Sequence, residues 1–333
     1  MELNQIFCSG MVLAANKPIR IFGTGSGRAA VRFLGMEKSV VSAGADWCLE
    51  LPAQPYGGPY ELDITLDGVQ QHLHDVYVGE VLLLHGQSNI QFRLNESSYP
   101  VEQYEACPRL RLFSSPKFVN GEAKSLTDGW VACTKQTAGI FSAIGYHVGL
   151  EIAKARGCAV GLIACCQGAS VIQTWLPKGT EEALGICIAD ADRHRDHFKE
   201  PYRNWNPEGY LYEMSVKPLM PYSLSYVIWY QGESNATVAE GKVYDKLLAA
   251  LIAQRRRDFA DPELPFVVVE LAECLARAGE GWTLVQQAQN QVAERVFGVT
   301  TVRCADVCEN DNIHPPTKIY LSERVASVIL GKK

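Results

Sequence analysis

The chain of 333 residues lacks any run of about 18 consecutive apolar residues, the length that a membrane-spanning helix needs. It also lacks a surplus of positive charge, because 31 Lys and Arg stand against 37 Asp and Glu. Proteins that bind nucleic acids usually carry a basic surplus. We therefore expect neither a membrane nor a nucleic acid as partner. The apolar fraction of 47% is far above that of disordered chains, so the protein is expected to be globular.

Two further segments bear on charge and location. The densest basic segment, Arg255-Arg256-Arg257, is interpreted as the solvated end of a helix. The first residues, Met1 to Gln5, lack the basic and apolar stretches of a secretion signal. The sequence as it stands therefore predicts a cytoplasmic protein, unless a secreted form has had its signal removed.

Metal and cofactor motifs are also missing. The 11 cysteines show no Cys-x-x-Cys spacing, so a structural zinc site is not expected, and the thiols are interpreted as mostly reduced and buried. The pairs His72/His74 and His194/His197 have no convincing further ligands and are interpreted as surface histidines. The segment from Gly23 to Arg28 lacks the last glycine of a dinucleotide-binding loop. No metal and no cofactor are predicted.

Residues 1–78 predict a β-rich N-terminal domain. Apolar and polar residues alternate in short runs, and Gly, Asp and Pro separate these runs. The runs are Ile19–Phe22, Ala30–Phe33 and Tyr60–Ile64. A period of two residues with frequent turns is typical of a small antiparallel β-sandwich.

Residues 79–333 predict an α/β domain with a parallel sheet flanked by helices. Apolar strands are expected at Val81–Leu84, Ala159–Ala164, Val227–Trp229, Phe266–Leu271 and Thr301–Val307. Helices are expected around Ile140, Ile144, Val148 and Ile152, at Lys242–Asp258, and at Thr317–Leu330. In such sheets, catalytic residues gather on loops beyond the carboxyl ends of the strands.

Four segments with reactive residue types follow these strands. They are Gly86-Gln87-Ser88-Asn89, Cys166-Gln167-Gly168-Ala169-Ser170, Trp229 to Asn235, and Asp311-Asn312-Ile313-His314-Pro315. Each segment alone is compatible with an ordinary turn or helix cap. The spacing of Asp311 and His314 would let the carboxylate reach one ring nitrogen while the other accepts a proton from a nucleophile such as Ser88. Cys166 and Ser170 are rival nucleophiles, but neither has an obvious base.

The order and wording of these segments resemble the SGNH hydrolase superfamily, and within it the sialate O-acetylesterase type of carbohydrate esterase. The matching motifs are Val78-Gly79-Glu80-Val81, Gly86-Gln87-Ser88-Asn89, Gly168 with Trp175, Trp229-Tyr230-Gln231-Gly232-Glu233, and Asp311-x-x-His314-Pro315. Further similarity in Gly10 to Leu13, Gly57 to Tyr60 and Asn204 to Pro207 extends the resemblance from about residue 6 to about residue 330. The resemblance implies an SGNH-type three-layer α/β/α fold.

The resemblance also implies a serine esterase without a cofactor. Ser88 would be the nucleophile, His314 the general base, and Asp311 the residue that orients the imidazole. The backbone N–H groups of Ser88 and Gly168, together with the side-chain amide of Gln231, would form the oxyanion hole, with Asn235 as a substitute for Gln231.

For three other residues of these segments, two roles are compatible with the sequence. Glu233 would support the Gln231 loop or, alternatively, act directly, and Trp175 and Trp229 would either stack on a sugar or fill the core. The sequence departs from the family pattern at Ala169, which replaces a glycine, and the added methyl could alter the backbone beside Gly168.

The expected partner is an acetylated carbohydrate, with O-acetylated sialic acid as the favoured substrate. Acetylxylan or another acetylated glycan is the alternative, because the motifs report acyl chemistry rather than the sugar. A sugar-binding protein of the same fold without turnover is a third possibility. The sequence does not define the oligomeric state. It also does not identify an arginine that would bind the carboxylate of a sialic acid.

Overall fold

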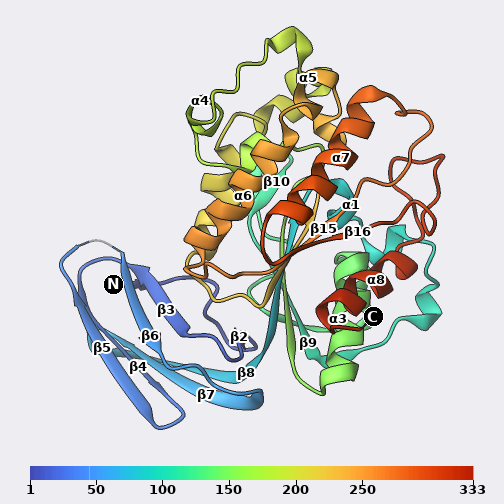
Figure 1. The fold of residues 1–333 in the computed structure, drawn as a ribbon. Coiled ribbons are helices and arrows are strands. Elements are labelled where there is room, and N and C mark those ends of the chain that lie inside the picture. Colours follow the sequence, from blue (N-terminus) through green and yellow to red (C-terminus); the bar gives the residue numbers. More distant parts are fainter. Residues whose placement is uncertain (45, 333) are drawn as a thin grey trace.

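A mainly parallel β-sheet runs through the centre of the protein, as the computed structural model in Figure 1 shows for residues 1–44 and 46–332. Its strand order is β12-β9-β13-β8-β14-β15-β16, and only β12 pairs antiparallel. The strands are β8 (Val69–Gly86), β9 (Cys107–Ser114), β12 (Val131–Cys133), β13 (Val160–Cys166), β14 (Tyr226–Tyr230), β15 (Phe266–Val269) and β16 (Val299–Val302). The carboxyl ends of β8, β13 and β14 lie side by side, which gathers their following loops at one edge.

The predicted strands are present, but the residue range predicted for the last one is wrong. The last was expected at Thr301–Val307, but β16 ends at Val302. The carbonyl of Cys304 accepts hydrogen bonds from the N–H groups of Val307 and Cys308, so the chain turns away from the sheet there. The parallel strand β9 was not predicted.

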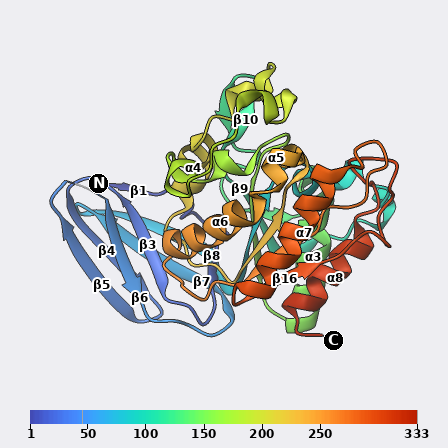
Figure 2. The same ribbon diagram turned by 45° about the horizontal axis from the view of Figure 1, so that its top comes forward.

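Two pairs of helices cover the sheet. Helices α3 (Ala143–Arg156) and α8 (Ile319–Ile329) pack together on one side, and α6 (Tyr244–Asp258) and α7 (Glu280–Arg295) pack together on the other (Figures 1 and 2). Ile140, predicted on the face of the first helix, lies before its start and is exposed. Helix α7 was not predicted. In the described part of the chain, no helix is long and apolar enough to cross a membrane.

The N-terminal part consists of two β-sheets. Strands β1 (Glu2–Leu3), β3 (Ile19–Thr24) and β6 (Trp47–Leu51) form one sheet. Strands β2 (Val12–Ala14), β4 (Gly27–Phe33), β5 (Met36–Ser42) and β7 (Gly57–Leu66) join the N-terminal half of β8. Strand β8 continues without a break into the central sheet, so the predicted boundary at residues 78/79 lies inside a strand that both parts share.

Short elements complete the fold. They are α1 (Ser88–Gln91), α2 (Lys135–Gly139), α4 (Thr180–Ala183), α5 (Val238–Gly241), β10 (Lys117–Val119) and β11 (Glu122–Lys124). All 11 cysteines are free thiols, and more than half of them are buried.

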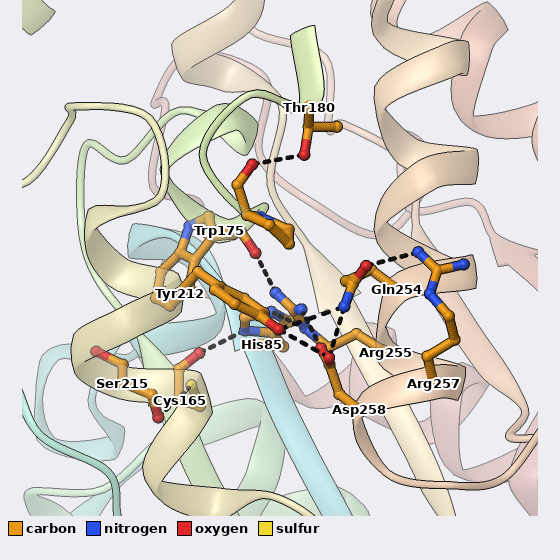
Figure 3. A network of polar contacts seen from close by, with 11 residues as sticks. His85, Cys165, Trp175, Thr180, Tyr212, Ser215, Gln254, Arg255, Arg257 and Asp258 are labelled. Carbon is orange, nitrogen blue, oxygen red and sulfur yellow. Dashed lines mark hydrogen bonds and ion pairs between the residues drawn. The ribbon is translucent and has the colours of Figure 1, made fainter. Parts of the chain in front are cut away.

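A buried polar network fastens helix α6 to the end of β8 (Figure 3). Arg255 is fully buried, so the interpretation of its segment as a solvated helix end is wrong for this residue. Its guanidinium donates to Asp258 at 2.8 Å, to the Nε2 of His85 at 3.3 Å, and to the backbone carbonyl of Trp175. Burial lowers the pKa of His85 well below its usual value, so the ring stays neutral and accepts this bond.

Candidate active site

Ser88 and His314 meet at the carboxyl edge of the sheet. Ser88 is the first residue of α1, directly after β8, and His314 lies in the loop before α8. The Oγ of Ser88 is 2.8 Å from the Nε2 of His314, although 226 residues separate them in sequence. Both line a cavity of about 420 Å³. This geometry allows the imidazole to accept the hydroxyl proton.

Asn89, which follows Ser88 in α1, connects this helix to the segment of His314. Its amide donates to the carbonyl of Ile313 at 2.9 Å, and its Oδ1 accepts from the ammonium of Lys318 at 2.7 Å. Partial burial lowers the pKa of His314, and the charge of Lys318 lowers it further, whereas Glu96 acts in the opposite direction. A lowered pKa keeps the imidazole neutral, which is the form that can take a proton.

Asp311 does not contact the base in this arrangement. Its side chain is exposed, and no hydrogen bond or ion pair joins it to His314 among the described residues. The neighbouring Asn312 turns its Oδ1 towards the loop instead and accepts from the backbone N–H of His314 at 2.9 Å. The orienting role expected for Asp311 therefore has no contact behind it and stays a prediction.

Glu233 lies in the cavity wall close to the pair. Its side chain is almost fully buried, and its Oε1 accepts from the amide of Asn89 at 2.5 Å. Its Oε2 is buried and has no hydrogen-bond partner among the described residues. Burial raises the pKa of this carboxyl, and the bond from Asn89 opposes that rise. Glu233 therefore supports the residue next to Ser88.

The backbone beside Gly168 holds an additional glutamine that the sequence analysis did not identify. The N–H of Gly168 donates to the Oε1 of Gln91 at 2.7 Å, so this expected oxyanion donor is occupied. A β-carbon on Gly168 would lie 3.6 Å from that of Ser88, which shows how near the two residues are. Ala169 has a φ of 53°, in the left-handed region that glycine reaches without strain. The methyl group of Ala169, which was expected to alter the backbone beside Gly168, therefore strains the backbone at Ala169 itself.

Gln231 does not line the cavity, so no contact in the structure supports its expected place in the oxyanion hole, which stays a prediction. Its side chain is fully buried, and its amide nitrogen donates to Gln87, the carbonyl of Ser170 and Asn235 at 2.8–3.1 Å. Its Oε1 accepts from the hydroxyl of Tyr244 at 2.7 Å. Both ends of the amide are committed to holding the loops together.

Asn235 belongs to the same buried network and does not replace Gln231 as a donor. Its amide nitrogen donates to Gln173 at 2.9 Å and to Glu240 at 3.1 Å. Its Oδ1 accepts from the backbone N–H of Ile172 and from Gln231. Buried amides with every group bonded rigidify a structure, so this network fixes the floor of the cavity.

Trp175 and Trp229 fill the core and do not line the cavity. Both are fully buried and pack edge-on against His85, with ring centroids 4.7 and 4.8 Å away. The indole N–H of Trp175 donates to the hydroxyl of Ser170 at 2.9 Å. This bond and complete burial also remove Ser170 as a nucleophile. Burial raises the pKa of the rival Cys166 to about 11, so it stays a thiol.

The lining of the cavity also includes residues to which the sequence gave no role in the site. His194 and His197, interpreted as surface residues, line it together with Tyr202, Trp205 and Arg277. His197 is buried, and burial lowers its pKa to about 3. No cluster of three or more potential metal ligands occurs among residues 1–44 and 46–332. The close spacing of the two histidines was visible in the sequence but could not show that they line the same cavity as Ser88.

Known proteins resemble this chain in sequence and in fold. A family described as carbohydrate esterase, sialic acid-specific acetylesterase matches residues 78–330. A crystal structure of a carbohydrate acetylesterase from Xanthomonas citri has a TM-score of 0.84 and 30% identity, covering 99% of this chain and 76% of that one.

Curated relatives from mammals match at lower identity. The sialate O-acetylesterases of Mus musculus and Homo sapiens are each 25% identical, over 86% of this chain. The chain spans only 63% and 60% of the length of these two relatives. The family match covers most of the chain and includes the segments of Ser88 and His314. This chain therefore belongs to the carbohydrate esterase family of the sialic acid-specific acetylesterases.

Proposed function

We propose that the protein is a serine O-acetylesterase that removes acetyl groups from acetylated sugars, with O-acetylated sialic acid as the favoured substrate. The observation that carries this proposal is the 2.8 Å contact between Ser88 and His314 in a cavity inside the family-matched region. We further propose that residues 79–333 form an SGNH-type three-layer α/β/α domain and that residues 1–78 form a β-sandwich-like accessory domain.

The reaction has two steps. The Nε2 of His314 accepts the proton of Ser88 while the Oγ forms a bond to the acetyl carbon. The tetrahedral intermediate then collapses, the bond to the sugar oxygen breaks, and His314 returns the proton to that oxygen. A water molecule then attacks the acetyl carbon with His314 again as base, the bond to Ser88 breaks, acetate leaves, and His314 returns the proton to the Oγ of Ser88.

The negative oxygen of the intermediate needs hydrogen-bond donors. The backbone N–H of Ser88 lies at the start of α1, where no intrahelical partner exists, and it makes no hydrogen bond to another described residue. Gly168 supplies a second N–H once the carboxamide of Gln91 turns away from it. Removing one such donor typically costs about 10²–10³ in turnover.

Acetate release from an aryl acetate and from acetylated sugars tests the proposal. Wild type should release acetate, and Ser88→Ala should not. Equal release by both proteins would exclude the serine mechanism, and no release by wild type would favour a sugar-binding protein without turnover. Comparing kcat/KM for acetylated sialic acids and acetylated xylooligosaccharides decides between O-acetylated sialic acid and acetylxylan as the substrate.

A further inference from the structure

We propose that Arg277 forms an anion subsite in the cavity and binds the carboxylate of an acidic sugar whose acetyl group lies at Ser88. This inference rests on the proposed function, because it places the substrate with respect to the proposed nucleophile. Arg277 and Ser88 line the same cavity of about 420 Å³, and Arg277 also lines a neighbouring hollow of about 530 Å³. The guanidinium therefore stands where a sugar ring bound at Ser88 would carry its substituents.

Arg277 has no carboxylate partner among the described residues. Its side chain is exposed, and among the described residues its guanidinium makes one hydrogen bond, from NH1 to the Nε2 of His194 at 3.1 Å. Arg193, on the same wall of the neighbouring hollow, shows the contrast. Both of its terminal nitrogens bond to the carboxylate of Glu181, at 3.1 and 2.9 Å. Arg193 is thus neutralised inside the protein, whereas Arg277 keeps its charge for a ligand.

The groups near Arg277 do not cancel this charge. Burial lowers the pKa of His194, the charge of Asp196 opposes this shift, and the charge of Arg277 adds to it, so the net shift favours the neutral ring at pH 7. The carboxylate of Asp196 lies 3.8 Å from Lys199 and 3.9 Å from His194. The other carboxyl group at the cavity, Glu233, is buried and bonded to Asn89.

The loop of Arg277 is tied to the loop of His314. The backbone N–H of Arg277 donates to the carbonyl of Cys274 at 2.9 Å, which forms a turn. The N–H of Leu275 donates to the carbonyl of Asn310 at 2.8 Å, four residues before His314. On the other side, the N–H of His194 donates to Glu240 at 3.0 Å. These bonds hold the backbone of Arg277 close to the loop of His314, and the bond to His194 ties the guanidinium to the segment of His194.

The chemistry of this wall fits a carboxylated sugar. A guanidinium offers parallel N–H donors that match both oxygens of a carboxylate. Tyr202, an exposed aromatic residue on the same wall, offers a ring face and a hydroxyl to a sugar. Sialic acids and uronic acids share the carboxylate and are distinguished by the experiment below.

Binding measured by calorimetry tests the subsite without turnover. The ligands are N-acetylneuraminic acid, glucuronic acid and the methyl ester of each, which removes the charge but retains the ring. For at least one of the two sugars, wild type should bind the acid about 10- to 100-fold more tightly than its ester. Arg277→Gln should bring this ratio close to one. Arg277→Lys, which keeps the charge but loses the paired donors, should give an intermediate ratio.

A matched control removes a positive charge far from the cavity. Arg32, in strand β4, is exposed and pairs with Glu37 at 3.2 Å, so Arg32→Gln should leave the wild-type ratio in place. Equal binding of acid and ester by wild type, a ratio unaffected by Arg277→Gln, or no binding of any ligand at millimolar concentration would overturn the subsite.

The preference for the acid over its methyl ester, measured in turnover, tests the subsite and the proposed function separately. The substrates are an O-acetylated N-acetylneuraminic acid and its methyl ester, compared through kcat/KM. Release of acetate without preference for the acid would retain the esterase and overturn the subsite. Carboxylate binding that depends on Arg277, but with no acetate released from any sugar, would retain the subsite and contradict the proposed function.

Discussion

The loops at the carboxyl edge of the sheet contain two layers of residues that differ in what they contact. The cavity layer consists of Ser88, Gly168, Glu233 and His314, which line the open space. The buried layer consists of Gln231, Asn235, Trp175 and Trp229, which are fully buried and bond or pack inside the protein. Residues of both layers come from the same short segments. Residue type alone therefore does not separate the groups that face a substrate from those that hold the loops.

The difference has a physical cause in hydrogen bonding. A buried amide must find partners for each of its polar groups, and Gln231 finds them in Gln87, Ser170, Asn235 and Tyr244. Ser88, in contrast, has His314 as its partner and borders open space. Substitutions in the cavity layer should therefore change turnover, and substitutions in the buried layer should change stability.

The largest effect is expected for Ser88→Ala. Without the hydroxyl no acetyl-enzyme can form, so kcat for acetate release should fall by at least about 10⁴-fold. The midpoint of thermal unfolding should stay close to that of wild type, because Ser88 lies at the edge of a cavity. A large loss of stability in this variant would contradict the assignment of Ser88 to the cavity layer.

Gln231→Leu should have the largest effect on stability. The substitution leaves the buried partners of the amide unbonded, and we expect the free energy of unfolding to fall by about 2–4 kcal/mol. Denaturant unfolding measures this quantity. Gln91→Ala is the control, because Gln91 is half-buried and its side chain makes one hydrogen bond among the described residues, to Gly168. Equal losses in the two variants would remove the distinction between the layers.

The acid limb of the pH profile should respond to charges near His314. The pKa of His314 is lowered from 6.5, so kcat/KM should stay high down to pH 6.5 and fall below it, as the imidazole takes up a proton. Lys318→Met removes a cation that lowers this pKa, and should move the limb to higher pH by up to about one unit.

Glu96→Gln provides the opposite change, because it removes a charge that raises the same pKa. The limb should then move to lower pH. Burial lowers the pKa of Lys318 to about 8, so its influence on the profile should be complete only below that pH. Shifts of both variants in the same direction would contradict the electrostatic account.

Asp311→Asn should have a smaller effect than a triad would produce. The carboxylate is exposed and makes no bond to His314 in the described structure, so we expect kcat to fall by less than about tenfold. The corresponding substitution in a working triad costs about 10⁴-fold. A loss of that size would show that Asp311 turns towards His314 during the reaction.

Ala169→Gly should have the smallest effect. Ala169 adopts a positive φ next to Gly168, and glycine relieves that strain but increases the entropy of the unfolded chain. We expect the free energy of unfolding to change by less than about 1 kcal/mol, measured in denaturant. A large increase would mean that the alanine distorts the loop more than its backbone angle suggests.

Much of the fold was predictable from local patterns. The apolar runs that became β8, β13, β14 and β15 are buried on both faces of a parallel sheet, so they show a continuous hydrophobic signal. Helix α7 was missed because polar residues, some of them buried, interrupt its apolar pattern, as in Gln286-Gln287-Ala288-Gln289-Asn290. The end of β16 was misplaced because the chain turns after the strand, through hydrogen bonds to the carbonyl of Cys304 that the sequence pattern does not show.

The sequence by itself determined the order of the four strand-end segments, the pairing of a serine with a distant histidine, and the resemblance to a family of carbohydrate esterases. These features depend on residue type and spacing, which can be read along the chain. The tertiary structure alone decided that Gln231 is buried, that Asp311 is exposed and that Arg277 and Ser88 line one cavity. Side-chain direction depends on contacts between segments up to 229 residues apart, and no local pattern contains them.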